Sequence, residues 1–553
     1  MAVTYTAISY APVQGFIEKS RKLRDLFGAS MILSHLSYEV VNHAHSIKEI
    51  DVISPGLINV KKGMPNRILL KGNFQEEETR KTKLEEVKQT WFVAWRKLLA
   101  RSRDFLEEEL DSYYANEWFW EEDWQKWGNH AWELFSGEGE TIKEAMESLE
   151  EGKLSRDWTA INWVGESSSL SGADAIACPG IGGVRRKPKQ QPWGEEGKKI
   201  KQFYTRLALI SDPKSKSGET SEESQPEGKF IDPQEKLSIP ELTKRLVTLD
   251  AVSSDLSRIR NFNELVRKVA DHSEEEGQWT GWFMGDGDKV GENIKAIEEV
   301  KGEAGVKEFS EVMRSWGRWF EDDFEKKNPG RIVYAGGDDF FGVLFNRKFP
   351  LKPLRSISGQ QILQCLNQLP QQWLEGKPEH LQDLTFSLGF VWAAPTVPQR
   401  DILQHCRETE KEAKNQGRDR VAIRVLFSSG QYVQWVCHWD YLKILDSYED
   451  LDGGKNWSHV YGDLAQLEAR HAFSLDLDSE QPLQKQEIFD NNKAALEFME
   501  IYFPGTKKLL KQNEQELFQA TDSVDRAWAM TQWIKDLITV GWYLCREGDS
   551  YGN

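Results

Sequence analysis

The segment that most constrains this chain runs from Arg331 to Leu344 and reads RIVYAGGDDFFGVL. Apolar, β-prone residues lead into two glycines and two adjacent carboxylates, Gly336-Gly337-Asp338-Asp339, and a second apolar run follows. This order predicts a β-hairpin whose tip carries the acids. Glycines let the backbone approach a phosphate because no Cβ stands in the way, and paired aspartates suit hard divalent cations such as Mg²⁺. The hairpin therefore indicates nucleotide chemistry.

A second acidic motif, Gly285-Asp286-Gly287-Asp288, precedes the hairpin. Alone, it is also compatible with a calcium loop or an ordinary turn. We expect Asp286 to end a strand of the same sheet, where neighbouring strands lie ~4.8 Å apart. Asp286, Asp338 and Asp339 could then converge at the ~4 Å spacing of a two-metal site. Because like-charged carboxylates at that distance are costly without cations, we favour a metal site over a structural role.

Strand and helix signals alternate from Trp279 to Phe427. Their order, β-α-α-β-β-α-β-α-β, fits an antiparallel sheet with helices on one face, the palm type of α+β architecture. After Gly430 the pattern is helical. We therefore predict a palm domain with the Gly-Gly-Asp-Asp hairpin at 276–430 and a C-terminal helical domain at 431–553.

The preceding part of the chain divides in two. Residues 1–210 form a first domain, in which a helix begins at Pro12 and runs to about Leu36. A Trp-rich helical insertion at about 77–155 is either core or a base-stacking surface, and its helical spacing favours core. Residues 211–275 comprise a linker rich in Ser, Pro, Glu and Gly and a small helical domain.

Composition narrows the class of protein. A chain of 553 residues with 39% hydrophobic residues exceeds one ordinary domain and can bury sizeable cores. Its formal net charge of −18 is unlike that of an isolated nucleic-acid binder, so polynucleotide contacts should be local or shared with partners. A basic stretch from Arg185 to Lys201 either contacts backbone phosphates or is a solvated loop.

Cysteine usage and hydropathy indicate the compartment. The five cysteines are scattered without a Cys-x-x-Cys pair, which disfavours a disulfide framework and a four-cysteine zinc site. The sequence shows no signal-peptide pattern, and no apolar run approaches the ~18 residues that span a bilayer. We expect a reduced, cytoplasmic protein without membrane contact.

Together these motifs resemble a known family. Gly336-Gly337-Asp338-Asp339 with Asp286-Gly287-Asp288 looks like the palm of the large subunit of type III CRISPR effector complexes, the Cas-ten family, a relative of diguanylate and adenylate cyclases. The segments PVQGFI from Pro12 and SRKLRDLFGAS from Ser20 are similar to the opening of the first palm-like domain in the type III-B (Cmr) branch. Further similar segments are Pro65-Asn66-Arg67, Ser387-Leu388-Gly389 and Ala413-Lys414-Asn415-Gln416-Gly417-Arg418. The resemblance implies an α+β chain with two palm domains, ferredoxin-like and nucleotide-cyclase-like, with helical insertions and a C-terminal helical domain.

The resemblance also implies an activity. A nucleotidyltransferase of this family would bind ATP at the interface of its palms and, when the assembled complex holds target RNA, make cyclic oligoadenylate by 3′-hydroxyl attack with loss of pyrophosphate. Other Cmr-type subunits, CRISPR guide RNA and target RNA would be its partners. Two Mg²⁺ or Mn²⁺ ions would serve as cofactors. The implied site residues are Asp286, Asp338 and Asp339 for catalysis and metal binding, Asp288 as a secondary metal ligand, and Gly336, Gly337, Ser387 and Lys414 for the nucleotide.

The chain departs from the family in two respects. Many members carry an amino-terminal HD nuclease, whereas this sequence opens at the first palm and has no His-Asp dipeptide, so HD nuclease activity is not expected. Many members also carry a cysteine zinc knuckle between the palms, where this sequence has only Cys178, so no zinc is expected.

Several alternatives stay open. The chain could adenylylate another acceptor such as S-adenosylmethionine, act as a silent scaffold of the same complex, or be a stand-alone cyclase. The intact aspartates argue against the scaffold, and the long flanking domains argue against the stand-alone cyclase. Ser387 could serve only its strand, and Lys414 could be solvated. We expect Arg21 and Arg24 to form salt bridges within the first domain, for example to Asp25 or Glu18.

Overall fold

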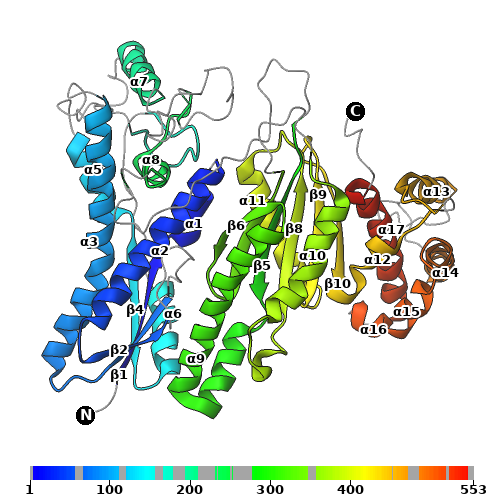
Figure 1. Ribbon diagram of the computed structural model, residues 1–553, viewed down its shortest axis with the longest axis horizontal. Coiled ribbons are helices and arrows are strands. Elements are labelled where there is room, and N and C mark those ends of the chain that lie inside the picture. Colours follow the sequence, from blue (N-terminus) through cyan, green and yellow to red (C-terminus); the bar gives the residue numbers. More distant parts are fainter. Residues whose placement is uncertain are drawn as a thin grey trace. The chain divides into compact units, whose positions relative to one another are not determined.

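The computed structural model (Figure 1) describes most of the chain in two compact units. The described residues are 4–20, 22–55, 67–110, 120–155, 166–177, 193–208, 231–232, 234–249, 252, 277–346, 356–450, 453–470, 485–518 and 522–545. Arg21, Pro65-Asn66, Cys178, the basic residues 185–189 and the linker 211–230 lie outside them. One unit comprises Met1–Val266, Gly291–Trp319 and Val333–Gly337, and the other comprises Arg267–Val290, Phe320–Ile332 and Asp338–Asn553. The four-part domain division stays a prediction.

The first unit is built on a four-stranded antiparallel sheet in the order β2-β3-β1-β4. Its strands are β1 (Thr4–Ala11), β2 (Ile50–Ser54), β3 (Arg67–Gly72) and β4 (Glu133–Gly139). The chain passes through α1 (Val13–Glu18) and α2 (Leu23–His45) between β1 and β2, and through α3 (Glu77–Leu110) and α5 (Trp120–His130) between β3 and β4. This βαββαβ succession is ferredoxin-like. The predicted first palm fold is confirmed.

The Trp-rich segment at 77–155 contributes both a helix and a strand to the first palm itself. It supplies α3, the second helix of the palm, and β4, which pairs with β1 from Tyr5↔Gly139 to Ala11↔Glu133. The strand reads ELFSGEG, and its two glycines and two glutamates hide the alternation that marks a half-buried strand. After β4 follows α6 (Ile142–Leu154).

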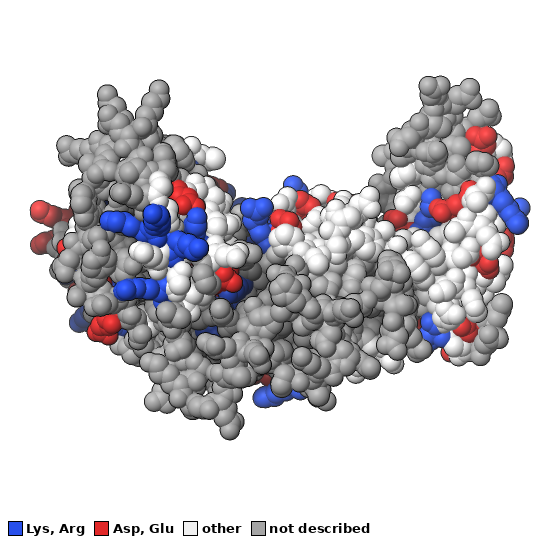
Figure 2. All heavy atoms as spheres, turned by 90° about the horizontal axis from the view of Figure 1, so that it is seen from above, with Lys and Arg blue, Asp and Glu red and all other residues white. Residues whose placement is uncertain are grey.

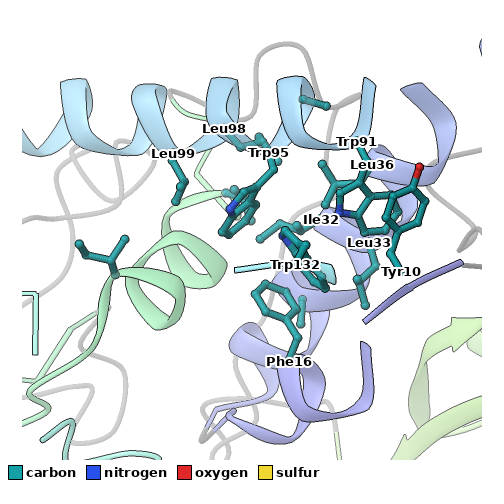
Figure 3. Close-up of a cluster of buried hydrophobic side chains, with 14 of the residues drawn as sticks. Tyr10, Phe16, Ile32, Leu33, Leu36, Trp91, Trp95, Leu98, Leu99 and Trp132 are labelled. Atoms are coloured by element: carbon teal, nitrogen blue, oxygen red, sulfur yellow. The ribbon is translucent and has the colours of Figure 1, made fainter. Parts of the chain in front are cut away.

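The tryptophan stripe of this segment forms core, as its helical spacing predicts. Trp91, Trp95 and Trp132 are at most 5% exposed and lie in one cluster with Tyr10 and Phe16 (Figure 3). Tyr10 stacks on Trp91 with ring centroids 3.9 Å apart, and Trp132 meets Trp91 and Trp95 edge-on at 5.4 and 5.8 Å. The described tryptophans of this cluster are therefore packing residues.

A buried ion cluster fixes α8 (Ile239–Leu246) to α2. Asp25 accepts two hydrogen bonds from Arg245 at 2.8 Å and one from the Lys22 N–H at 3.1 Å. Burial would raise the pKa of Asp25, but the Arg245 guanidinium holds it well below its usual range. The Lys22 N–H bond caps α2, so the helix expected from Pro12 to about Leu36 is two helices. Arg24 donates to Thr248 Oγ1 at 3.0 Å.

The second unit contains most of a six-stranded sheet in the order β10-β9-β8-β5-β7-β6. The strands are β5 (Thr280–Gly287), β6 (Gly330–Ala335), β7 (Asp339–Leu344), β8 (Phe386–Ala393), β9 (Arg420–Leu426) and β10 (Tyr432–His438). Helix α9 (Val290–Lys327) connects β5 to β6, and α10 (Gly359–Leu374) lies between β7 and β8. The four strands β8-β5-β7-β6 repeat the order of the first sheet, so the second palm fold is also confirmed.

Two details of the second palm correct the sequence analysis. Strand β9 runs parallel to β8, so the sheet is not purely antiparallel. Because parallel strands need a crossover connection, α11 (Gln399–Asn415) links them and lies over the face opposite to that packed by Phe320 and Phe324 of α9. Helices therefore cover both faces.

In the described part of the region after Gly430, the elements are helical except for β10, which pairs with β9 where helix was expected. The further helices are α12 (Ile444–Ser447), α13 (Trp457–Ala469), α14 (Lys485–Tyr502), α15 (Thr506–Gln512), α16 (Glu514–Leu517) and α17 (Ser523–Cys545). Trp533 of α17 donates its indole N–H to the Val436 carbonyl at 2.8 Å and so covers the edge strand. None of the helices that the structure describes is long and apolar enough to cross a membrane.

Candidate active site

Strand register brings the predicted acids to one end of the second sheet. Asp286, near the end of the central strand β5, lies directly opposite Asp339 of β7 on one side and Ser387 of β8 on the other. Directly opposed residues of antiparallel strands project from the same face with Cβ atoms ~4.5–5.5 Å apart. The Gly287 N–H donates to the Asp338 carbonyl at 2.8 Å and ties the two acidic turns together. The structure therefore brings together residues that lie far apart in the sequence.

Glycines at two positions permit this approach. A Cβ on Gly287 would lie 2.6 Å from Val290 Cγ2 and 3.2 Å from Asp338 Cβ, so a larger residue would separate the turns. Gly337 has φ +149°, which L-residues with side chains rarely adopt, and the space around its missing Cβ is open. The hairpin backbone at Gly337 is therefore accessible to a phosphate.

Lys414 of α11 points at the acids. Its ammonium forms an ion pair with the Asp286 carboxylate and a second one with Glu410 at 2.5 Å. Its side chain is 27% exposed, so it is held against the sheet. Burial raises the pKa of Asp286, whereas the hydrogen bond and charge of Lys414 lower it. Burial likewise lowers the pKa of Lys414, but its hydrogen bonds to Asp286 and Glu410 outweigh this and raise it, so the ammonium stays charged.

Asp288 is held by three donors of the protein and is only 4% exposed. Its carboxylate accepts from Ser387 Oγ at 2.7 Å, from Thr385 Oγ1 at 2.9 Å and from the Asp419 N–H at 2.9 Å. Ser387 thus directs its hydroxyl to Asp288. The metal role of Asp288 and the nucleotide role of Ser387 stay predictions.

A strained turn follows α11. Arg418 and Asp419 have φ values of +66° and +48°, a left-handed backbone that is rare for residues other than glycine. Two contacts fix it: the Asp419 N–H bonds Asp288, and the Asp419 carboxylate accepts from His438 Nε2 at 3.0 Å. That hydrogen bond, opposed by burial, raises the pKa of His438. Strained residues of this kind concentrate at functional sites.

Glu410, Asp419 and His438 were missed by sequence reasoning. Glu410 precedes Lys414 by four residues on one helix, a spacing that marks an ion pair and could have found it. No comparable signal links Asp419 with His438, because their contact depends on the pairing of β9 with β10.

The donor chemistry at the sheet end suits a hard cation. Asp286, Asp338 and Asp339 offer the carboxylate oxygens that Mg²⁺ and Mn²⁺ prefer, and the Lys414 ammonium already neutralises Asp286 as a cation would. Among the residues that the structure describes, no group of three or more His, Cys, Asp and Glu side chains is arranged to hold a metal ion. A metal ion would therefore share Asp286 with Lys414 or take its place.

Comparison with known proteins agrees with both palms. Residues 5–100 match the family described as CRISPR-associated protein Cmr2, N-terminal. Residues 280–422 match the family described as Cas10/Cmr2, second palm domain, and include all of the predicted site residues. No curated protein matches the sequence.

Several solved structures are similar to this chain. A type III-B Cmr-beta cryo-EM structure of the apo state has a TM-score of 0.53 at 10% identity, with 91% of this chain and 77% of that chain covered, and shares the fold. The Csm1-Csm4 cassette in complex with cA4 has a TM-score of 0.45 at 14% identity, covering 97% and 70%. Csm1 of T. onnurineus has a TM-score of 0.46 at 13% identity, with 99% of this chain and 70% of that chain covered. With these two matches, at residues 5–100 and 280–422, the chain contains the N-terminal domain and the second palm domain of the Cas10/Cmr2 family.

Proposed function

We propose that this chain is the catalytic large subunit of a type III RNA-guided antiviral complex and synthesises cyclic oligoadenylate from ATP when target RNA is bound. The observation that carries the proposal is the pairing of Asp286 with Asp339 across β5 and β7, beside the half-buried Lys414, in a Cas10/Cmr2 second palm. Each elongation step joins the 3′-oxygen of the growing chain to the α-phosphorus of an incoming ATP, and the last step joins it to the α-phosphorus of the chain's own 5′-triphosphate, which closes the ring. In every step the bond from this phosphorus to the oxygen that bridges it to the β-phosphate breaks, pyrophosphate leaves, and the hydroxyl proton passes to solvent.

Asp286, Asp338 and Asp339 would hold the divalent cations, which would lower the pKa of the attacking hydroxyl and neutralise the triphosphate. Lys414 contributes a second positive charge from α11. Before substrate binds, its ammonium lies on Asp286 and Glu410. A triphosphate competes with Asp286 for this ammonium. When the ammonium turns to the triphosphate, a metal cation bound to Asp286 replaces it as the counter-charge of that carboxylate. Binding of the cation and binding of the nucleotide are thereby favourable to each other.

Asp288 and the glycines shape the site. Asp288 holds the β5 turn against β8 through Ser387 and Thr385, so it orients Asp286 two residues away. Gly337 leaves the hairpin backbone open where phosphates would approach. In this assignment Asp288 is a positioning residue, and Ser387 acts through it.

The test uses the assembled complex, purified with its guide RNA and incubated with ATP, Mg²⁺ or Mn²⁺ and matching target RNA, with and without S-adenosylmethionine. Mass spectrometry identifies the products. We expect cyclic oligoadenylate that depends on target RNA. A product that also requires S-adenosylmethionine would replace the proposed acceptor with that molecule, and no RNA-dependent product under any condition would leave the chain a scaffold.

A further inference from the structure

Helix α7 (Trp193–Leu207) has two faces of opposite character. Ile200, Phe203, Tyr204 and Leu207 are at most 5% exposed and join the core of the first unit. From Lys198 onward the opposite face is solvent-exposed, and its residues are Lys198, Lys199, Lys201, Gln202, Thr205 and Arg206. At 100° per residue these six side chains occupy one continuous arc.

The apolar face holds the helix in a fixed position. Tyr204 donates its hydroxyl to the Leu237 carbonyl at 2.7 Å and accepts from the Ala177 N–H at 3.1 Å. Phe203 packs edge-on against Tyr204 at 5.1 Å. The charged face is therefore presented by a docked helix and keeps a constant orientation on the first unit.

The charge of this face contrasts with the rest of the chain, whose formal net charge is −18. Glu195 and Glu196 in the first turn stand three or four positions before Lys198 and Lys199, whereas from Gly197 to Leu207 every ionisable group with a charge at pH 7 is positive. The sequence gives Lys201 no acidic residue three or four positions away. On the other exposed helices, lysines pair with such acids, as in Lys81–Glu77, Lys126–Asp123 and Lys143–Glu147. Figure 2, which looks down on the side that carries α7, shows Lys and Arg side chains gathered over the position of this helix.

We propose that the exposed face of α7 binds the phosphate backbone of single-stranded RNA. Lysine and arginine with glutamine and threonine between them are the side chains that proteins direct at phosphate oxygens. Lys198 to Arg206 spans ~12 Å along the helix, the length of two or three phosphates. The basic residues Arg185, Arg186, Lys187 and Lys189 precede the helix and extend the positive segment in the sequence.

The exposed face of α7 is less suited to two other kinds of anionic partner, an acidic protein and a membrane surface. A protein partner would need an apolar or aromatic anchor at the centre of its interface, and a membrane surface would need apolar side chains to insert. Between Lys198 and Arg206 all large apolar side chains belong to the buried face. RNA is the polyanion that the proposed function supplies, and in this respect the inference rests on it.

The experiment measures RNA affinity without ATP, so it can fail separately from the synthase assay. The full chain is titrated against a fluorescent 30-nucleotide single-stranded RNA by anisotropy, in KCl from 50 to 200 mM. The test variant is Lys198→Gln with Lys201→Gln and Arg206→Gln. The control variant removes the same charge from other exposed helices, with Lys81→Gln, Lys143→Gln and Lys301→Gln.

Affinity falls as salt rises, and the loss of three phosphate contacts makes the negative slope of log affinity against log salt shallower by about 2. The loss of affinity between 50 and 200 mM KCl therefore becomes about 16-fold smaller. We expect this change in the test variant and a slope within experimental error of wild type in the control. Equal slopes in both variants, or wild-type affinity in the test variant, would overturn the proposal. A poly-glutamate peptide that binds as tightly as the RNA and depends equally on the three residues would overturn it in favour of an acidic protein partner.

Discussion

Lys414 on α11 and Asp286 at the end of β5 form an ion pair, although 127 residues separate them in the chain. The pair lies on the face of the sheet that also carries Asp339, the residue opposite Asp286. It gives the acidic site its own counter-charge, so the second palm can fold before cation and nucleotide bind.

Lys414→Gln removes this charge. We expect kcat/KM for ATP to fall by about 100-fold or more, because a preorganised charge aimed at the reacting phosphates is lost. Product formation by the assembled complex measures the change. Lys411→Gln, an exposed position on the same helix, is the matched control and should keep wild-type activity. Equal activity of the two variants would remove Lys414 from the nucleotide site.

Asp338→Ala combined with Asp339→Ala should abolish product and leave assembly intact. Both residues lie at the hairpin tip, where Asp339 is exposed, so their loss removes ligands without emptying core volume. Mass spectrometry of the products and size-exclusion chromatography of the complex are the readouts. Asp490→Ala, an exposed acid of the C-terminal helices, serves as the control. If the double variant fails to assemble, the tip has a structural role.

Asp288→Asn separates positioning from metal binding. An asparagine amide can accept at only one of its two terminal atoms, so at least one of the three donors on Asp288 loses its acceptor. We expect the free energy of unfolding to fall by about 1–3 kcal/mol, as measured by chemical denaturation.

The second readout is the Mg²⁺ concentration that gives half-maximal activity. A positioning residue leaves this concentration near its wild-type value, whereas Asp286→Asn should raise it. A comparable increase in both variants would make Asp288 a metal ligand instead.

Gly389→Ala should push α11 away from the sheet. The added Cβ would lie 2.3 Å from the Glu410 nitrogen and 2.6 Å from the Cys406 carbonyl oxygen, both of them backbone atoms that cannot rotate aside. Overpacking of this kind costs about 1–3 kcal/mol, and we expect a lower Tm together with reduced activity, because α11 carries Lys414. Gly152→Ala on α6, whose nearest neighbouring atom would be 3.8 Å away, should leave Tm unchanged or raise it. A wild-type Tm for Gly389→Ala would show that the helix has room to move.

Asp25→Asn tests the buried ion cluster through pH. The pKa of Asp25 is lower in the folded protein than its ordinary value, so its contribution to stability is present above about pH 4 and is lost as pH falls towards the folded value. We expect the variant to be less stable than wild type at pH 7 by urea denaturation, and this difference to shrink progressively below pH 4. Asp51→Asn, an exposed control, should change stability by less than about 0.5 kcal/mol. A difference that is constant from pH 7 to pH 3 would contradict the role of Asp25.

Local patterns were sufficient for much of the fold. Glycine next to aspartate between apolar runs predicts the hairpin at Gly336 to Asp339, and helical spacing predicts that Trp91 and Trp95 are core residues. Local patterns failed to predict two strands, β4 and β10, because the sequence signal there was weak or misleading. The strand β4 contains two glycines and two glutamates, and β10 opens the region after Gly430, in which all later elements that the structure describes are helical. Both strands exist because a neighbouring strand, β1 or β9, offers them a ladder of hydrogen bonds.

By itself the sequence determined the two acidic motifs, their place in an α+β palm and the resemblance of its two palm regions to the Cas10/Cmr2 family. Only the tertiary structure decided what surrounds each acid: Lys414 on Asp286, the hydroxyls of Ser387 and Thr385 on Asp288, and His438 on Asp419. The physical reason is that strand register and helix packing set these contacts, between residues 19 to 128 positions apart. Side-chain type and local spacing can be read directly from the sequence, whereas the partner of a charged group is determined only when the sheet has formed.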